Sequence, residues 1–208
     1  MIFTGDEFRD GLQHISTVLD KKKVKGAFFV TGKFVEDKKS ANILAKLERK
    51  GHLVGPHSDK HLLYSPWENR DSLLVTKEEF VNDLEANVER LEKLGIKRGK
   101  IFVAPYEWYN KKIVDWSAER GYDVYNFTYG LRTAADYTYP EMGVKYMSSE
   151  KILNQLYDYE KTNGLNGFII LIHLGTDSRR TDKLYWRLGE IIDELRSKKY
   201  NFVPLENL

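Results

Sequence analysis

Short apolar runs alternate with amphipathic segments along the whole 208-residue chain. Residues 24–31, 100–104 and 167–172 are apolar runs that predict buried strands, and the segments between such runs have apolar side chains at helical spacing. The order of strand, loop and helix recurs about six or seven times, which is typical of a parallel sheet wrapped by helices. We therefore predict an α/β fold, a distorted (β/α) barrel with about seven parallel strands, in a single domain over residues 1–208.

Several segment boundaries follow from the same patterns. Residues 7–21 have an apolar face that begins at Phe8, and they predict a first helix. Thr76–Glu79 has the sequence of a capping box and predicts the start of another helix. Residues 182–197 predict the last helix, and residues 202–203 the last strand.

Composition excludes several classes of protein. The 33 basic and 31 acidic side chains leave a net charge of +2, which gives no support to nucleic-acid binding. Cysteine is absent, so disulfides and thiolate metal sites are excluded. No apolar run approaches the roughly 20 residues that span a bilayer, and we find no signal peptide. The oligomeric state, and whether further domains precede Met1, remain open.

Polar and charged side chains follow the predicted strands. Because the carboxyl ends of parallel strands gather at one rim of a barrel, we expect these side chains to share that rim. They are Asp6 and Glu7, His57, Pro105 and Tyr106, Asn126, and His173.

Two histidines stand four residues apart, at His57 and His61. If the backbone turns helically here, both imidazoles lie on one face. Two neutral imidazoles directed at one point are two of the three ligands of a metal site, and only a carboxylate is lacking. The alternative is two surface histidines that are close by coincidence, because so short a motif has many false matches.

Other motifs in the chain favour one interpretation of this histidine pair. His57-Ser58-Asp59-Lys60-His61 matches His-Ser/Thr-x-x-His, Leu171-Ile172-His173 ends an apolar strand as Leu-x-His, and Thr4-Gly5-Asp6-Glu7 aligns with Thr-Phe-Asp-Asp. In these motifs the chain resembles the polysaccharide deacetylases, the NodB-homology domain of carbohydrate esterase family 4. The resemblance covers essentially the whole chain and implies a NodB-like deacetylase barrel.

The resemblance also implies roles for these residues. Asp6 is expected to be the general base and His173 the general acid. Glu7, His57 and His61 are expected to hold a divalent metal, with Zn²⁺ first and Co²⁺ or Ni²⁺ as alternatives. The roles of Asp6 and Glu7 could be exchanged or shared. Without the resemblance, the two would be acids in the first turn of a helix.

Two motifs depart from the family pattern. Where the family has Arg-x-Pro-Tyr-Gly, this chain has Val103-Ala104-Pro105-Tyr106-Glu107, so the arginine that orients the base is missing. Arg132, Arg179 and Arg180 are candidates to replace it, and Glu107 is a further candidate metal carboxylate. The fourth motif aligns with residues 126–130 and lacks its tryptophan. The predicted substrate-binding residues are Pro105, Tyr106, Glu107, Trp108 and Asn126.

The implied function is that of a metal-dependent hydrolase that removes acetyl groups from a carbohydrate, with an N-acetylglucosamine-containing glycan as the first expectation. Two alternatives remain: a carbohydrate-binding protein with a degenerate site, and a hydrolase of small amides. For such a substrate we favour a secreted, periplasmic or cell-envelope location over the cytoplasm. Whether the reaction is N- or O-deacetylation is open.

Overall fold

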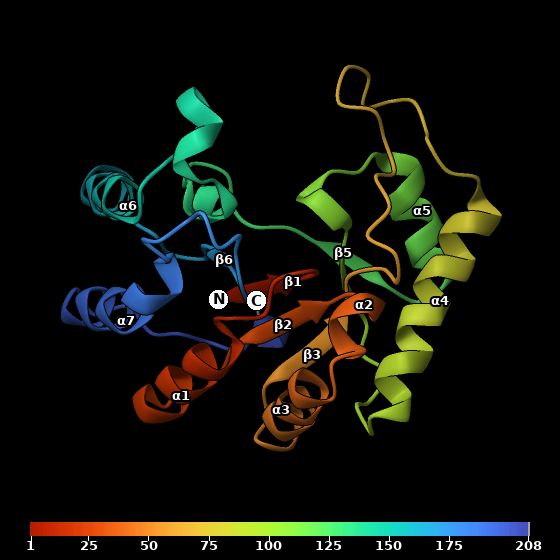
Figure 1. Ribbon diagram of the computed structural model, residues 1–208, viewed down its shortest axis with the longest axis horizontal. Helices are drawn as coiled ribbons and strands as arrows, with labels where there is room; N and C mark the ends of the chain where they lie inside the picture. The colour runs from red at the N-terminus through yellow and green to blue at the C-terminus, as the bar shows by residue number, and fades with distance from the viewer. Residues whose placement is uncertain (208) are drawn as a thin grey trace. The chain divides into compact units, whose positions relative to one another are not determined.

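A computed structural model describes residues 1–207 of the chain (Figure 1). The predicted α/β class is confirmed, because parallel strand pairs and helices alternate along the sequence. The chain forms two compact units. Unit 1 comprises residues 1–27 and 127–208, and unit 2 comprises residues 28–126. No helix within residues 1–207 is both long enough and apolar enough to cross a bilayer.

Unit 1 is built on two paired strands from opposite ends of the chain. Strand β1 (Ile2–Gly5) runs parallel to β6 (Leu171–His173), with Thr4 opposite His173. All four residues of β1 are buried. Because the strands are parallel and in this register, the residues that follow β1 and the end of β6 lie at the same edge of the pair.

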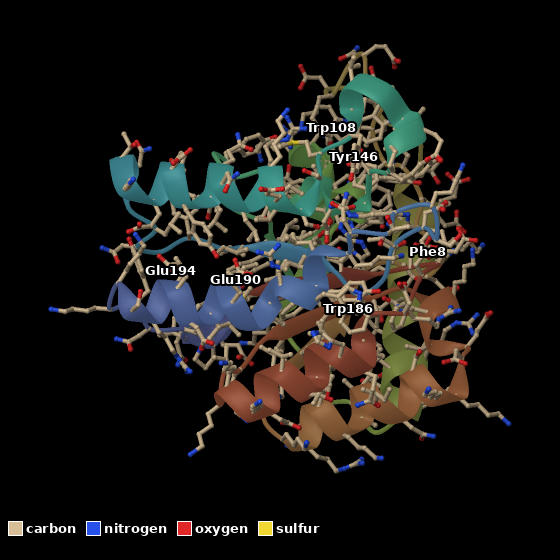
Figure 2. The ribbon with its side chains drawn as sticks, turned by 60° about the vertical axis from the view of Figure 1, so that its left-hand side comes forward. Phe8, Trp108, Tyr146, Trp186, Glu190 and Glu194 are labelled. Atoms are coloured by element: carbon tan, nitrogen blue, oxygen red, sulfur yellow. The ribbon has the colours of Figure 1, made fainter. Side chains whose placement is uncertain are left out.

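The helices of unit 1 are α1 (Leu12–Lys22), α6 (Ser149–Asn163) and α7 (Leu188–Ser197). Helices α1 and α7 lie side by side (Figure 1), and each has one apolar, buried face. Glu190 and Glu194 lie on α7 away from that apolar face (Figure 2). The remaining segments include four short 3₁₀ helices: η2 (Thr133–Tyr137), η3 (Pro140–Lys145), η4 (Leu184–Arg187) and η5 (Leu205–Asn207).

Unit 2 contains the other strands and helices. Its strands are β2 (Ala27–Val30, which starts at the end of unit 1), β3 (Leu53–Pro56), β4 (Ile101–Val103) and β5 (Asp123–Tyr125). Strand β4 runs parallel to β5. Its helices are α2 (Gly32–Val35), α3 (Lys38–Arg49), α4 (Lys77–Lys93) and α5 (Lys111–Glu119), with the 3₁₀ turn η1 (Pro105–Glu107) after β4.

Helix α4 is central to the core of unit 2. Its buried Phe80, Leu84 and Val88 pack with Phe102 of β4 and with Tyr64. Burial of each such side chain contributes about 1.5–3 kcal/mol. This packing fixes one face of α4 and therefore the direction of every side chain on it.

The predicted capping box at the start of α4 is confirmed. Thr76 Oγ1 accepts a hydrogen bond from the Glu79 N–H at 3.2 Å, and Glu79 accepts one from the Thr76 N–H at 2.7 Å. A cap of this kind stabilises a helix by about 1 kcal/mol.

Several predicted boundaries are wrong. Helix α1 begins at Leu12 and not at residue 7, and Phe8 is 39% exposed at the surface of unit 1 (Figure 2). The last helix is split into η4 and α7. Strand β6 begins only at Leu171 and not at residue 167, since its ladder with β1 begins at the pair Ile2 and Leu171. Residues 202–203 lie outside any strand, so residues 1–207 form six strands where about seven were expected.

Candidate functional site

The loop from His57 to His61 in unit 2 brings two imidazole rings together. The ring centroids of His57 and His61 are 5.1 Å apart. The segment is not helical, so the helical turn assumed from the spacing is wrong. Instead, Ser58 and His61 adopt positive φ angles of 69° and 55°. Such conformations are unfavourable for residues other than glycine and persist only where the surroundings impose them.

Side chains from α4 impose this conformation. Asp83 accepts hydrogen bonds from the backbone N–H groups of Asp59 (3.1 Å) and Lys60 (3.0 Å). Asn87, one helical turn further on, accepts one from the N–H of His57 at 2.9 Å. Both side chains are buried, at 4% and 0% exposure. Burial raises the pKa of Asp83, although its hydrogen bonds act in the opposite direction.

Ser58 contributes to the same loop from within. Its hydroxyl oxygen accepts a hydrogen bond from the His61 N–H at 2.9 Å. This contact steadies the backbone between the two histidines. The second histidine is thus fixed by a residue of its own motif, and the first by α4.

The ring of His57 is held in one tautomer. Its Nδ1 lies 2.7 Å from the carbonyl oxygen of Val103, at the end of β4. A carbonyl oxygen only accepts hydrogen bonds, so Nδ1 carries a proton, and in the neutral imidazole Nε2 keeps its lone pair. Metal-binding histidines commonly have this second hydrogen bond. The chemistry of this pair therefore fits a divalent metal.

The turn after β4 adjoins His61. Tyr106 and Glu107 have positive φ angles of 60° and 53°, and the Tyr106 ring lies 4.4 Å from the ring of His61. Asn126 donates a hydrogen bond from Nδ2 to the carbonyl of Glu107 at 2.9 Å. Four of the six non-glycine residues with positive φ in residues 1–207 thus belong to the two segments 57–61 and 105–107. Such clustering of strained backbone is typical of functional sites.

Aromatic side chains continue from Tyr106. Trp108, predicted to bind substrate, is partly buried and lies 5.6 Å from the ring of Trp67. Trp67 is 55% exposed and also contacts the ring of Tyr106 edge-on at 5.7 Å. Sequence patterns did not single out Trp67, because it stands in a loop without periodicity.

Unit 1 supplies the second cluster of site residues. His173 ends β6, and Asp6 follows β1, whose Thr4 is in register with His173. The carboxylate of Asp136 in η2 lies 2.5 Å from His173 Nδ1 and also accepts the His173 N–H at 3.0 Å. Asp136 is fully buried. It therefore fixes the ring so that Nε2 is the nitrogen available for proton transfer.

Asp6 and Glu7 are not helix-capping acids. Helix α1 begins at Leu12 and has no acidic residue in its first turn. Asp6 is partly buried and Glu7 is exposed. The alternative explanation of this acidic pair is therefore wrong, and their roles as base and metal ligand stay predictions.

Two of the arginines considered as replacements for the missing one have identified contacts. Arg180 is buried, and its guanidinium donates to the carbonyl oxygens of Thr138 at 2.6 Å and Met147 at 3.0 Å. Arg179 pairs with Asp177 at 2.5 Å. These contacts stabilise loops of unit 1. Whether any arginine acts on Asp6 stays a prediction.

A complete metal site is not formed within either cluster. In the part of the chain that the structure describes, no group of three or more Asp, Glu, His or Cys side chains is arranged to hold a metal ion. Two of the predicted ligands, His57 and His61, belong to unit 2, and the predicted third ligand, Glu7, belongs to unit 1.

Comparison with known proteins identifies the family. Residues 4–125, more than half of the chain, match the polysaccharide deacetylase family, so the chain belongs to that family. A peptidoglycan-N-acetylglucosamine deacetylase from Bacillus cereus is 25% identical over 206 residues, covering 97% of this chain and 66% of the relative. The chain spans 63–66% of the length of the curated relatives that it matches first.

Solved structures show the same fold. The Bc1960 peptidoglycan N-acetylglucosamine deacetylase matches 99% of this chain and 86% of its own, with a TM-score of 0.76 at 22% identity. BA3943 from Bacillus anthracis, described as a pseudoenzyme of carbohydrate esterase family 4, matches 100% of this chain and 64% of its own, with a TM-score of 0.73 at 18% identity. The predicted fold, that of the NodB-type deacetylases, is thus confirmed.

Proposed function

We propose that this chain is a metal-dependent deacetylase that acts on an N-acetylglucosamine-containing glycan. The observation that supports this most strongly is the His57–His61 pair, with rings 5.1 Å apart and His57 fixed as a lone-pair donor through Nε2. Family membership and the similar peptidoglycan deacetylases support the class of substrate. N-deacetylation is the reaction that those relatives' names describe, and we extend it to this chain as part of the proposal.

We assign the metal to His57, His61 and a carboxylate of the Asp6–Glu7 pair. Two imidazoles and one carboxylate with open positions suit Zn²⁺ first, and Co²⁺ or Ni²⁺ second. When bound, such an ion would lower the pKa of a water molecule and polarise the acetyl carbonyl.

The protein's own residues have separate tasks in this reaction. Asp6 would take the proton of the attacking water, and the backbone N–H of Tyr106 would stabilise the tetrahedral oxyanion. His173 would protonate the departing amine. Asp136 holds His173 at Nδ1, so the acid is oriented before the substrate binds.

A second candidate function is carbohydrate binding without catalysis. It is favoured by Val103, which stands where the family has an arginine, and by the likeness of the fold to a pseudoenzyme. Loss of that arginine would leave Asp6 less well oriented as a base. Binding would survive such a loss, because sugar recognition does not need the base.

Acetate release distinguishes the two candidates. Metal-stripped protein is supplied with Zn²⁺ and incubated with N-acetylated chito-oligosaccharides or acetylxylan. We expect zinc-dependent acetate release that falls more than about 100-fold in His57→Ala, since a metal ligand is lost. His14→Ala, which removes a histidine of α1, is the matched control and should retain activity. Oligosaccharide binding without acetate release would instead establish the non-catalytic function.

A further inference from the structure

We propose that Trp67 is a stacking platform for the sugar residue next to the acetylated one, so that the protein prefers oligosaccharides over single sugars. This inference rests on the proposed function, because it uses the His57–His61 pair as the place of reaction. Its evidence is the position, exposure and fixation of one indole ring in unit 2.

A continuous series of rings connects Trp67 with the histidine pair. The His57 and His61 rings are 5.1 Å apart, the His61 and Tyr106 rings 4.4 Å, and the Tyr106 and Trp67 rings 5.7 Å. The last contact is edge-to-face, with an interplanar angle of 82°. The platform is therefore separated from the histidines by the width of one tyrosine ring, which suits a neighbouring sugar of the same chain.

The outer two rings of this series are open to solvent. Trp67 is 55% exposed and Tyr106 is 45% exposed. Adjacent exposed aromatic side chains beside a reactive site commonly mark a binding surface. A pyranose ring suits such a surface, because one of its faces is formed by C–H groups while its hydroxyl groups point outward to water and polar side chains.

The loop that presents Trp67 is fixed. Trp108 Nε1 donates to the carbonyl of Pro66 at 3.4 Å, directly before Trp67. The Arg70 guanidinium lies over the Trp108 ring at 4.5 Å, and its Nε donates to the carbonyl of Tyr109 at 2.6 Å. Trp108 and Arg70 thus fasten both sides of the exposed indole. Because the platform is ordered before the ligand arrives, little conformational entropy is lost on binding.

Trp67 and Trp108 differ in how much of each ring is open to a sugar. Trp108 was predicted from the motif to contact substrate, but Arg70 covers one face of its ring. The Trp67 ring contacts the rings of Trp108 and Tyr106 and is still 55% exposed, more than the partly buried Trp108. We therefore assign the contact with the sugar to Trp67. Trp108 holds the loop that presents Trp67.

The test compares binding of N,N′,N″,N‴-tetraacetylchitotetraose with binding of N-acetylglucosamine by calorimetry, on metal-stripped protein so that no turnover occurs. Stacking that covers roughly 60 Å² of indole surface contributes about tenfold in affinity. We expect Trp67→Ala to weaken tetrasaccharide binding about tenfold, Trp67→Phe to weaken it less, and the monosaccharide to be affected less than the tetrasaccharide. Trp186→Ala is the matched control, since Trp186 is 56% exposed but lies in η4 of unit 1.

The outcomes separate this inference from the proposed function. Unchanged tetrasaccharide affinity in Trp67→Ala, or an equal loss in Trp186→Ala, would overturn the platform even if wild-type protein releases acetate. A selective loss in Trp67→Ala would support it even if no acetate is released. Arg70→Ala provides a second variant with an intact indole, and it should weaken the tetrasaccharide because the platform is no longer fixed.

Discussion

Replacing Asp83 by asparagine should disturb the His57–His61 loop from a distance. The carboxylate of Asp83 accepts two backbone hydrogen bonds, from Asp59 to Oδ2 and from Lys60 to Oδ1. Asparagine keeps one acceptor oxygen but turns an NH₂ group toward the other N–H. The variant therefore loses one hydrogen bond and leaves two donors facing each other in a buried site.

The size of the effect follows from these contacts. A hydrogen bond to a charged group contributes about 1.5–3 kcal/mol, and an unsatisfied buried donor costs about 1–3 kcal/mol. Part of this loss is offset, because burial raises the pKa of Asp83 and the neutral amide avoids the cost of a buried charge. We expect the free energy of unfolding to fall by about 2 kcal/mol, which is a decrease of roughly 0.8 M in the urea midpoint.

Urea unfolding at neutral pH measures this change. Asp115→Asn is the matched control, because Asp115 forms only an exposed ion pair with Lys111 and should change stability by less than about 0.5 kcal/mol. Zinc affinity measured on the same proteins should fall about 10- to 100-fold in Asp83→Asn alone. An Asp83→Asn protein as stable as the control, with unchanged zinc affinity, would refute the claim that α4 imposes the loop conformation.

Two further predictions concern unit 1. Burial alone would raise the pKa of Asp10, but the hydrogen bond from Tyr185 and the charge of Lys183 outweigh it and lower that pKa below its ordinary value of 3.8. Ionised Asp10 therefore stabilises the folded protein above its ordinary pKa, and this stabilisation is lost as pH falls through the lower folded pKa. In Asp10→Asn, the free energy of unfolding measured by circular dichroism should therefore fall less steeply below about pH 4 than in wild type. Asp136→Asn removes the carboxylate that holds His173 Nδ1, so acetate release should fall at least about tenfold because the proposed acid is no longer oriented. Full acetate release in Asp136→Asn would contradict this role of Asp136.

The sequence predicted those features that depend on local pattern. Apolar runs marked the strands because buried parallel strands need apolar side chains on both faces. The capping box at Thr76 was visible because its partners are three residues apart. The His57–His61 pair was found from spacing, although for the wrong conformation.

Features that depend on tertiary contacts were missed. One such feature is the start of α1 at Leu12 instead of residue 7. The segment before the helix is held by tertiary contacts, because the N–H of Gly11 donates to the carbonyl of Leu174 and Asp10 accepts from the N–H of Thr176. Periodicity cannot detect partners more than 160 residues away. Asp136 was missed for the same reason, since its partner His173 is 37 residues distant and Asp136 itself stands in a segment without helical or strand periodicity.

Titration of metal-stripped protein with Zn²⁺ tests the central claim most directly. We expect one zinc ion per wild-type chain, with affinity at least about 100-fold lower in both His57→Ala and His61→Ala and unchanged in His14→Ala. Wild-type protein that binds no zinc, cobalt or nickel, or a His57→Ala protein that binds zinc as tightly as wild type, would contradict the account.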